Sequence, residues 1–269
     1  MTLALFALGL LLSPLLVTPP SLHAEEQAQK IVIAGAQSIV PLAEEFSIQF
    51  RKAHPKAAIE IRGGGSNYGV VAARQGEAHV GHIARELSAA EKTHLQIIFL
   101  GRDAIIFMTY PGNPVRDLTL AQLRRVYSAQ VANWRELGGE DKGIVPLTRE
   151  PGSALHATFA ERLFGKNSEA REKAFTIRAS KEKILNTIKR VSGCIGYGIV
   201  RPEEAEAQGV RILAIEGMLA SSDNVSLGLY PFTRSQFLLT KERPTPLADE
   251  WARSFAAFVK QKAAGQEPR

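Results

Sequence analysis

Residues 33–38 read Ile-Ala-Gly-Ala-Gln-Ser, a short apolar strand that runs into a glycine turn and then into a helical pattern. The same kind of junction returns as Ile-Arg-Gly-Gly-Gly-Ser at 61–66 and as Arg-Glu-Pro-Gly-Ser at 149–153. The start of a helix presents unpaired backbone N–H groups and about half a positive charge, so each junction offers a place for an anion. Three junctions, with Arg85 and Arg149 as charged donors, predict a site that surrounds a small oxyanion.

Strand-like runs alternate with helical periods along almost the whole chain, as in sheets that carry helices on both faces. Residues 31–34 form a short apolar strand, and apolar side chains then recur at helical spacing over 39–50. Ser38 is the expected N-cap of that helix, and His54-Pro55 is expected to end it. The pattern predicts an α/β fold of mixed sheets flanked by helices.

Three further helix starts are visible in the sequence. Thr119 and Gln122 have the spacing of a capping box, in which each side chain bonds the backbone of the other end of the turn. Ser180 precedes another apolar helical stripe, and Thr245-Pro246 precedes the last one.

Two apolar, strand-like runs at 104–110 and 235–240 are bounded by turn residues. The stretch between them, about 111–229, has strands and helices of its own and is long enough for an inserted lobe. We therefore expect two lobes joined by two crossover strands. Lobe one is expected from 30–108 plus 232–262, and lobe two from 110–230.

The first 24 residues contain no Lys, Arg, Asp or Glu, and their apolar run ends in a small-residue motif at Ala24. These features predict a secretory signal peptide over 1–24, which leaves 269 − 24 = 245 residues. The alternative is a membrane anchor, but the run is short for a span of about 20 residues and Pro14 interrupts it. Cys194 is the single cysteine, so neither an internal disulfide nor a lipid-bearing cysteine after the apolar run is available. An exported chain of this kind is expected in the periplasm.

The formal net charge is +6, and its charges are dispersed along the chain without a basic tract. This pattern argues against nucleic-acid binding, while a mild positive excess would help to recruit a small anion.

From about residue 30 to 262 the chain resembles the periplasmic phosphate-binding proteins of bacterial phosphate ABC transporters. The most distinctive match is Leu-Thr-Leu-Ala-Gln-Leu at 118–123, followed by Asn-Trp-Arg-Glu-Leu-Gly-Gly at 133–139. The other matching segments, in order along the chain, are 33–38, 63–66, 149–153, 193–197 and 230–234.

The resemblance implies a two-lobed fold of the type II periplasmic binding proteins, with the anion held in the cleft between the lobes. It implies capture of a tetrahedral oxyanion, most of all inorganic phosphate, and delivery to an ABC transporter permease. No cofactor, no metal and no chemistry on the ligand are implied, and the chain is expected to be a monomer. The residues that the resemblance proposes for the ligand are Ser38, Ile39, Ser66, His79, Arg85, Arg149 and Ser153.

The chain departs from the family pattern at three positions. Ala84 stands where the family has a serine, Leu155 where it has a threonine, and His79 where it has an aspartate. That aspartate accepts a hydrogen bond from protonated phosphate and repels sulfate, so His79 predicts weaker discrimination between the two anions.

Other interpretations of the same residues remain open. The three junction serines could be helix caps only, and Arg85 could pair with Glu86 or Glu91. His79 and His82 have the spacing of a metal pair, but on a strand they would point to opposite faces. A hydrolase built on Ser153 and its neighbour His156 would lack a marked acid to orient the base. Another oxyanion, or phosphate sensing without transport, would use the same cleft.

Overall fold

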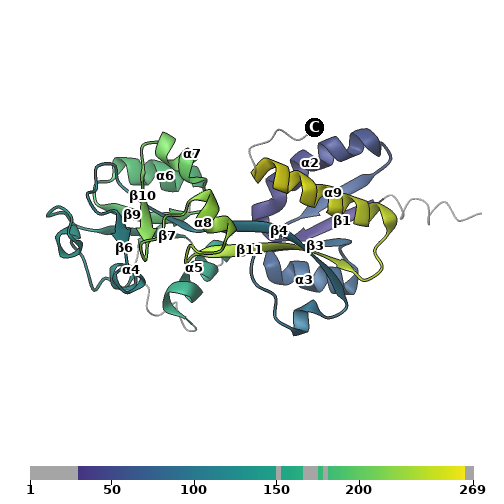
Figure 1. Ribbon diagram of the computed structural model, residues 1–269, viewed down its shortest axis with the longest axis horizontal. Helices are drawn as coiled ribbons and strands as arrows, with labels where there is room; N and C mark the ends of the chain where they lie inside the picture. The colour runs from purple at the N-terminus through teal and green to yellow at the C-terminus, as the bar shows by residue number, and fades with distance from the viewer. Residues whose placement is uncertain (1–29, 150–152, 166–174, 178–180, 264–269) are drawn as a thin grey trace, which may run out of the picture.

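The computed structural model describes residues 30–149, 153–165, 175–177 and 181–263. The predicted signal peptide and the predicted helix cap Ser180 lie outside these residues. Figure 1 shows two lobes joined by a pair of long strands, β4 (Leu95–Ala104) and β11 (Thr233–Lys241). β4 and β11 pair in antiparallel register along their whole length, with an irregularity between Gln236 and Phe237.

Lobe one contains a five-stranded sheet in the order β2-β1-β3-β11-β4. Its first three strands are parallel, and β11 runs against β3. Helices α2 and α9 cover one face and α3 covers the other (Figure 1). The bounds are β1 Lys30–Gly35, β2 Ala58–Arg62, β3 Val80–Ile83, α2 Val40–Ala53, α3 Gly65–Gln75 and α9 Pro246–Ala263, with short 3₁₀ turns at Gln37–Ile39 (η1) and Ala90–Lys92 (η2).

Lobe two contains a six-stranded sheet in the order β6-β10-β5-β9-β7-β8. β5 continues the chain from β4 and is antiparallel to both of its neighbours. The strands are β5 Ile106–Thr109, β6 Asp117–Leu118, β7 Val145–Arg149, β8 Phe175–Ile177, β9 Cys194–Gly198 and β10 Arg211–Ile215. The helices are α4 Leu120–Tyr127, α5 Ala154–Phe164, α6 Lys181–Arg190, α7 Pro202–Ala207 and α8 Ser222–Ser226, with a 3₁₀ turn at Trp134–Leu137 (η3).

Each lobe has its own aromatic core. In lobe one Phe46 of α2 packs against Trp251 and Phe255 of α9, with ring centroids 5.6 and 5.5 Å away. In lobe two Phe159 of α5 stacks on Tyr197 of β9 at 4.0 Å. Burial of apolar side chains is the main stabilising contribution in such cores. Each lobe therefore has a core of its own that keeps its sheet and helices in position.

The predicted fold class, with two strands that cross between the lobes, is confirmed. The run at 235–240 lies in β11 as expected, but the other crossover strand is β4, and most of the run at 104–110 forms β5 of lobe two. The capping box is also confirmed, because Gln122 N donates to Thr119 Oγ1 at 3.1 Å and Thr119 N donates to Gln122 Oε1 at 2.8 Å. Helix α2 ends at His54 as expected. The prediction that Ser38 caps this helix is wrong, because Ser38 lies inside the η1 turn and the N-cap of α2 is Ile39.

Candidate functional site

The strand register places the carboxyl ends of the lobe-one strands beside the hinge formed by β4 and β11. β11 enters lobe one at Thr233 and runs antiparallel to β3, with Phe237 opposite Ile83. β3 therefore ends toward the hinge, as do β1 and β2, which are parallel with it. Ligands of open α/β sheets bind outside the carboxyl ends of the strands. The first two glycine junctions lie at this edge.

Lobe two presents the third junction to the same hinge. β5 begins at Ile106 directly after the crossover, and Gly198, the last residue of β9, is opposite it. β7 is parallel to β9, so Arg149 at the end of β7 also lies on the hinge side. The strand ends that carry the predicted residues therefore lie on the hinge side of both lobes (Figure 1).

Close backbone packing shapes the first junction. Gly35 has φ of +142°, and a Cβ there would lie 2.0 Å from the carbonyl oxygen of His82. The same carbonyl accepts a hydrogen bond from Ala36 N at 3.0 Å. The chain can therefore turn into η1 only with glycine at this position. Ser38 is exposed in that turn and Ile39 is buried beneath it.

The second junction begins α3 and touches the first. Gly64 and Gly65 both have positive φ, at 127° and 83°, and Gly64 is the N-cap of α3. A Cβ on Gly63 would lie 2.3 Å from Oε1 of Gln37. The two helix starts are thus adjacent, with their unpaired N–H groups at one edge.

Ser66 connects this helix start to the end of β3. Its Oγ accepts a hydrogen bond from Ala84 N at 3.0 Å. A hydroxyl that accepts in this way still has its own proton to donate, so Ser66 can donate to an anion while it holds the loop after β3. The serine that the family pattern places at position 84 would have been a further hydroxyl, and alanine stands there instead.

Arg85 is held by an acidic neighbour of the same lobe. Its guanidinium donates to both carboxylate oxygens of Glu91, at 2.6 and 3.0 Å, and to Asn67 Oδ1 at 2.7 Å. Hydrogen bonds from Arg85 lower the pKa of Glu91 to about 2. This is the pairing that the sequence left open as the alternative to a ligand contact.

In lobe two, Arg149 and Ser153 are separated by residues 150–152, which lie outside those described. The hydroxyl of Tyr197 bonds Thr148 Oγ1 at 2.8 Å and accepts from Arg149 N at 3.3 Å, which fixes the end of β7. Ser153 is the N-cap of α5 and makes no capping bond with its side chain. β7 thus ends on the hinge side at Arg149, and α5 begins at Ala154.

His79 is the predicted site residue that the structure does not bring to this edge. It precedes β3, and its Nδ1 accepts a hydrogen bond from Val32 N at 3.1 Å, three residues before Gly35. Burial, Lys30 and Lys241 lower its pKa, and both lysines lie at strand ends away from the hinge. The expectation that His79 reads the protonation of the anion is therefore corrected. The residues around His79 alone do not reveal which end of β3 it occupies.

His82 is the histidine that lies at the site, whereas the sequence analysis considered it only as one of a possible metal-binding pair. It is fully buried, and its Nδ1 lies 3.2 Å from the carbonyl oxygen of Ala36. Its Nε2 lies 2.7 Å from Oε1 of Gln236 in β11. The only signal in the sequence was the three-residue spacing of His79 and His82. On a strand, this spacing would place the two side chains on opposite faces.

A cavity of about 330 Å³ lies at the hinge and is lined from both lobes. Glu86 contributes from lobe one, Arg162 of α5 from lobe two, and Arg102 and Ser235 from the hinge strands. Burial and the nearby Arg234 lower the pKa of Arg162, which donates to the Pro231 carbonyl at 3.1 Å. Arg162 is a further cation at the hinge, besides Arg102 and Arg234 of the hinge strands, and the sequence analysis identified none of the three.

The arrangement matches a known family. A comparison with protein-family patterns finds the PBP superfamily domain over residues 22–262. The chain belongs to the PBP superfamily.

Individual PBP-superfamily proteins resemble it over most of their length. The phosphate-binding protein PstS of Bacillus subtilis is 28% identical over 241 residues, which cover 86% of this chain and 77% of that protein. An ABC-type phosphate transport receptor from Vibrio cholerae superposes with a TM-score of 0.71 at 24% identity, over 87% of this chain and 95% of that one. A putative phosphate ABC transporter substrate-binding protein from Clostridium perfringens, solved with bound phosphate, gives 0.65 at 28% identity, over 88% and 96%.

The described part of this PBP-superfamily chain contains no group of three or more His, Cys, Asp or Glu side chains that could hold a metal ion. None of its described helices is both long enough and apolar enough to cross a membrane.

Burial raises the pKa of the Cys194 thiol to about 12, so this cysteine stays protonated and unreactive at neutral pH.

Proposed function

We propose that this chain captures a tetrahedral oxyanion, most of all inorganic phosphate, between its lobes and delivers it to an ABC transporter permease. The observation that carries the proposal is the strand register. It supports the proposal, because the strands that precede the Ser38, Ser66 and Arg149–Ser153 junctions all end on the hinge side. Phosphate binding and transport, the roles for which these relatives are named, agree with this assignment.

The chemistry of these groups suits an oxyanion. Helix starts contribute backbone N–H donors, the serines contribute hydroxyl donors, and Arg149 can give two parallel charge-assisted bonds. Such a set stabilises bound negative charge without a nucleophile or a metal. The proposed role is therefore binding and release, and not catalysis.

Closure of the lobes follows from contacts on both sides. An anion bonded to both sheet edges binds the closed form better than the open form, so it shifts the population toward closure. β4 and β11 are the hinge strands in this proposal. Small-angle scattering should show a smaller radius of gyration at saturating phosphate, and an unchanged radius would count against closure.

Location and assembly complete the proposal. The proposal includes export to the periplasm by the predicted signal peptide. It also includes a monomeric state and a permease in the inner membrane as the partner. A sensing role without transport would use the same cleft, and transport of labelled phosphate in cells that lack the chain would distinguish the two.

The second candidate is capture of a different oxyanion. Ala84 and Leu155 are apolar where the family pattern has hydroxyls, so the hydrogen-bond set differs from that of phosphate binders. Calorimetry with phosphate, sulfate, arsenate, molybdate and methylphosphonate on residues 25–269 tests the assignment. Tightest binding of phosphate supports it, and tighter binding of another anion replaces it.

A further inference from the structure

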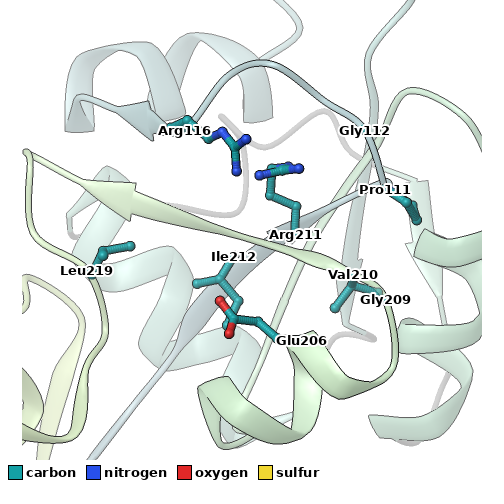
Figure 2. A pocket seen from close by; sticks show the side chains of 9 residues that line it. All are labelled: Pro111, Gly112, Arg116, Glu206, Gly209, Val210, Arg211, Ile212 and Leu219. Atoms are coloured by element: carbon teal, nitrogen blue, oxygen red, sulfur yellow. The ribbon is translucent and has the colours of Figure 1, made fainter.

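A pocket in lobe two lies apart from the site between the lobes. Figure 2 shows its lining, which includes Arg116, Arg211 and Glu206 together with apolar side chains of Val210, Ile212 and Leu219. Its volume is about 510 Å³, within the range of about 300–1,000 Å³ common for small-molecule sites.

The pocket lies at the end of the lobe-two strands that is away from the hinge, whereas Arg149 lies at the hinge end. Arg211 is the first residue of β10 and pairs with Thr109, the last residue of β5. β5 begins at the hinge, so its end and the start of β10 point away from it. A ligand in this pocket would therefore bind independently of one between the lobes.

Two guanidinium groups reach into the pocket from neighbouring segments. Ala214 N of β10 donates to Arg116 O at 2.9 Å, which holds the Arg116 segment beside β10. In Figure 2 the guanidinium groups of Arg116 and Arg211 extend into the same part of the pocket. Like charges held near each other repel, and a bound anion would remove that repulsion.

Neither arginine is neutralised within the part of the chain that the structure describes. The salt bridges found there include no acidic partner for Arg116 or Arg211, and Glu206 lies beyond Ile212 in Figure 2. The Nε of Arg211 is buried and has no hydrogen-bond partner. A buried unpaired donor of a charged group is costly, so this atom marks a missing acceptor.

We propose that this pocket is a second anion-binding site, specific for a small organic oxyanion. The carboxylate or phosphoryl head lies between Arg116 and Arg211 and accepts from the terminal N–H groups of their guanidinium ends. Its apolar body lies against Leu219, whose side chain is 54% exposed. The volume exceeds what one inorganic anion fills, and the carboxylate of Glu206 disfavours a ligand with a second negative group.

Calorimetry with phenylphosphonate tests the proposal, with inorganic phosphate and benzyl alcohol as the probes that lack the body or the charge. Arg149→Ala serves as the parent protein, so that binding between the lobes is weakened. We expect saturable binding of phenylphosphonate at one site per chain, with weaker binding of the other two probes. Arg116→Gln and Arg211→Gln should each weaken it by about tenfold or more, while Arg125→Gln, an exposed arginine of α4, should not.

Three results would overturn the proposal: no saturable binding of phenylphosphonate, binding unchanged in Arg116→Gln and Arg211→Gln, or binding of inorganic phosphate that is equally tight and is weakened equally by these two substitutions. If Arg211→Gln fails to fold by circular dichroism, the exposed Arg116 still provides the test. The measurement uses a parent protein whose binding between the lobes is already weakened. A negative result would therefore count against the second site only, and not against phosphate capture between the lobes.

Discussion

His82 of β3 lies 2.7 Å, ring Nε2 to side-chain Oε1, from Gln236 of the hinge strand β11. The other ring nitrogen lies 3.2 Å from the Ala36 carbonyl oxygen in the first glycine junction. Gln236 in turn donates to Asp103, which accepts two hydrogen bonds from Arg234. One buried imidazole thus links a helix start at the proposed site to both hinge strands.

Acid should destabilise the protein through His82. Burial lowers the pKa of His82 to about 4, below an unfolded value of about 6.5, so the unfolded chain binds the extra proton between these values. Stability is therefore full above about pH 6.5 and falls as the pH drops toward 4, by about 2 kcal/mol between pH 7.5 and 5. Urea unfolding at both pH values measures this difference.

The His82→Gln variant should lose most of that pH dependence. His94→Gln is the matched control, because the side chain of His94 is 83% exposed. The pKa of His79 is also lowered, so His79 contributes to the pH dependence of stability with the same sign in both variants. An equal pH slope in wild type and His82→Gln would contradict the assignment.

Ser66→Ala should lower both stability and phosphate affinity. The substitution leaves Ala84 N without its acceptor and removes a hydroxyl from the proposed site. We expect a loss of about 1–3 kcal/mol in the free energy of unfolding and about tenfold in affinity. Ser192→Ala, in an exposed turn of lobe two, should change neither. A variant with lower stability but unchanged affinity would reduce Ser66 to a structural role.

Arg85→Ala should act mainly on Glu91. Without its guanidinium partner, the pKa of Glu91 should rise from about 2 toward the ordinary value of 4.5, as a carboxyl NMR titration can measure. Phosphate affinity should fall less than in Arg149→Ala, because Arg85 already has an acidic partner. If the two variants lose affinity equally, Arg85 contacts the anion directly.

Asp103→Asn should weaken the hinge. The side chains of Arg234 and Asp103 are only 5% and 20% exposed, so loss of the carboxylate leaves a buried guanidinium unpaired. Such a loss costs about 3–5 kcal/mol. Asp141→Asn breaks the exposed pair with Arg135 and should cost about 0–1 kcal/mol. Equal urea midpoints for the two variants would show that the hinge pair has no special importance.

The sequence predicted the alternation of strands and helices because apolar periodicity and turn residues are local. The capping box at Thr119 and the end of α2 at His54 are likewise set by neighbours within a few residues. The three junctions followed from glycine and serine positions alone. Their common position beside the hinge needed the strand register, which pairs residues such as Ile83 and Phe237 across 154 positions.

Two site assignments needed the structure for the same reason. The sequence places His79 and His82 three residues apart but does not say which one lies at the hinge side of β3. The pairing of Arg85 with Glu91 competed in the sequence with a ligand contact, and only side-chain geometry resolves the pair. Arg162 and Arg211 were not identified, because each becomes notable only through its position in a cavity beside groups distant in the chain.

The most direct test of phosphate capture is a calorimetric titration of phosphate into wild type, Arg149→Ala and Arg135→Ala. Arg135 is an exposed arginine of the same lobe and pairs with Asp141, so it controls for loss of charge. We predict saturable binding at one site in wild type and Arg135→Ala, and affinity lower by about ten- to a hundredfold in Arg149→Ala. No phosphate binding by wild type, or equal affinity in wild type and Arg149→Ala, would contradict the account.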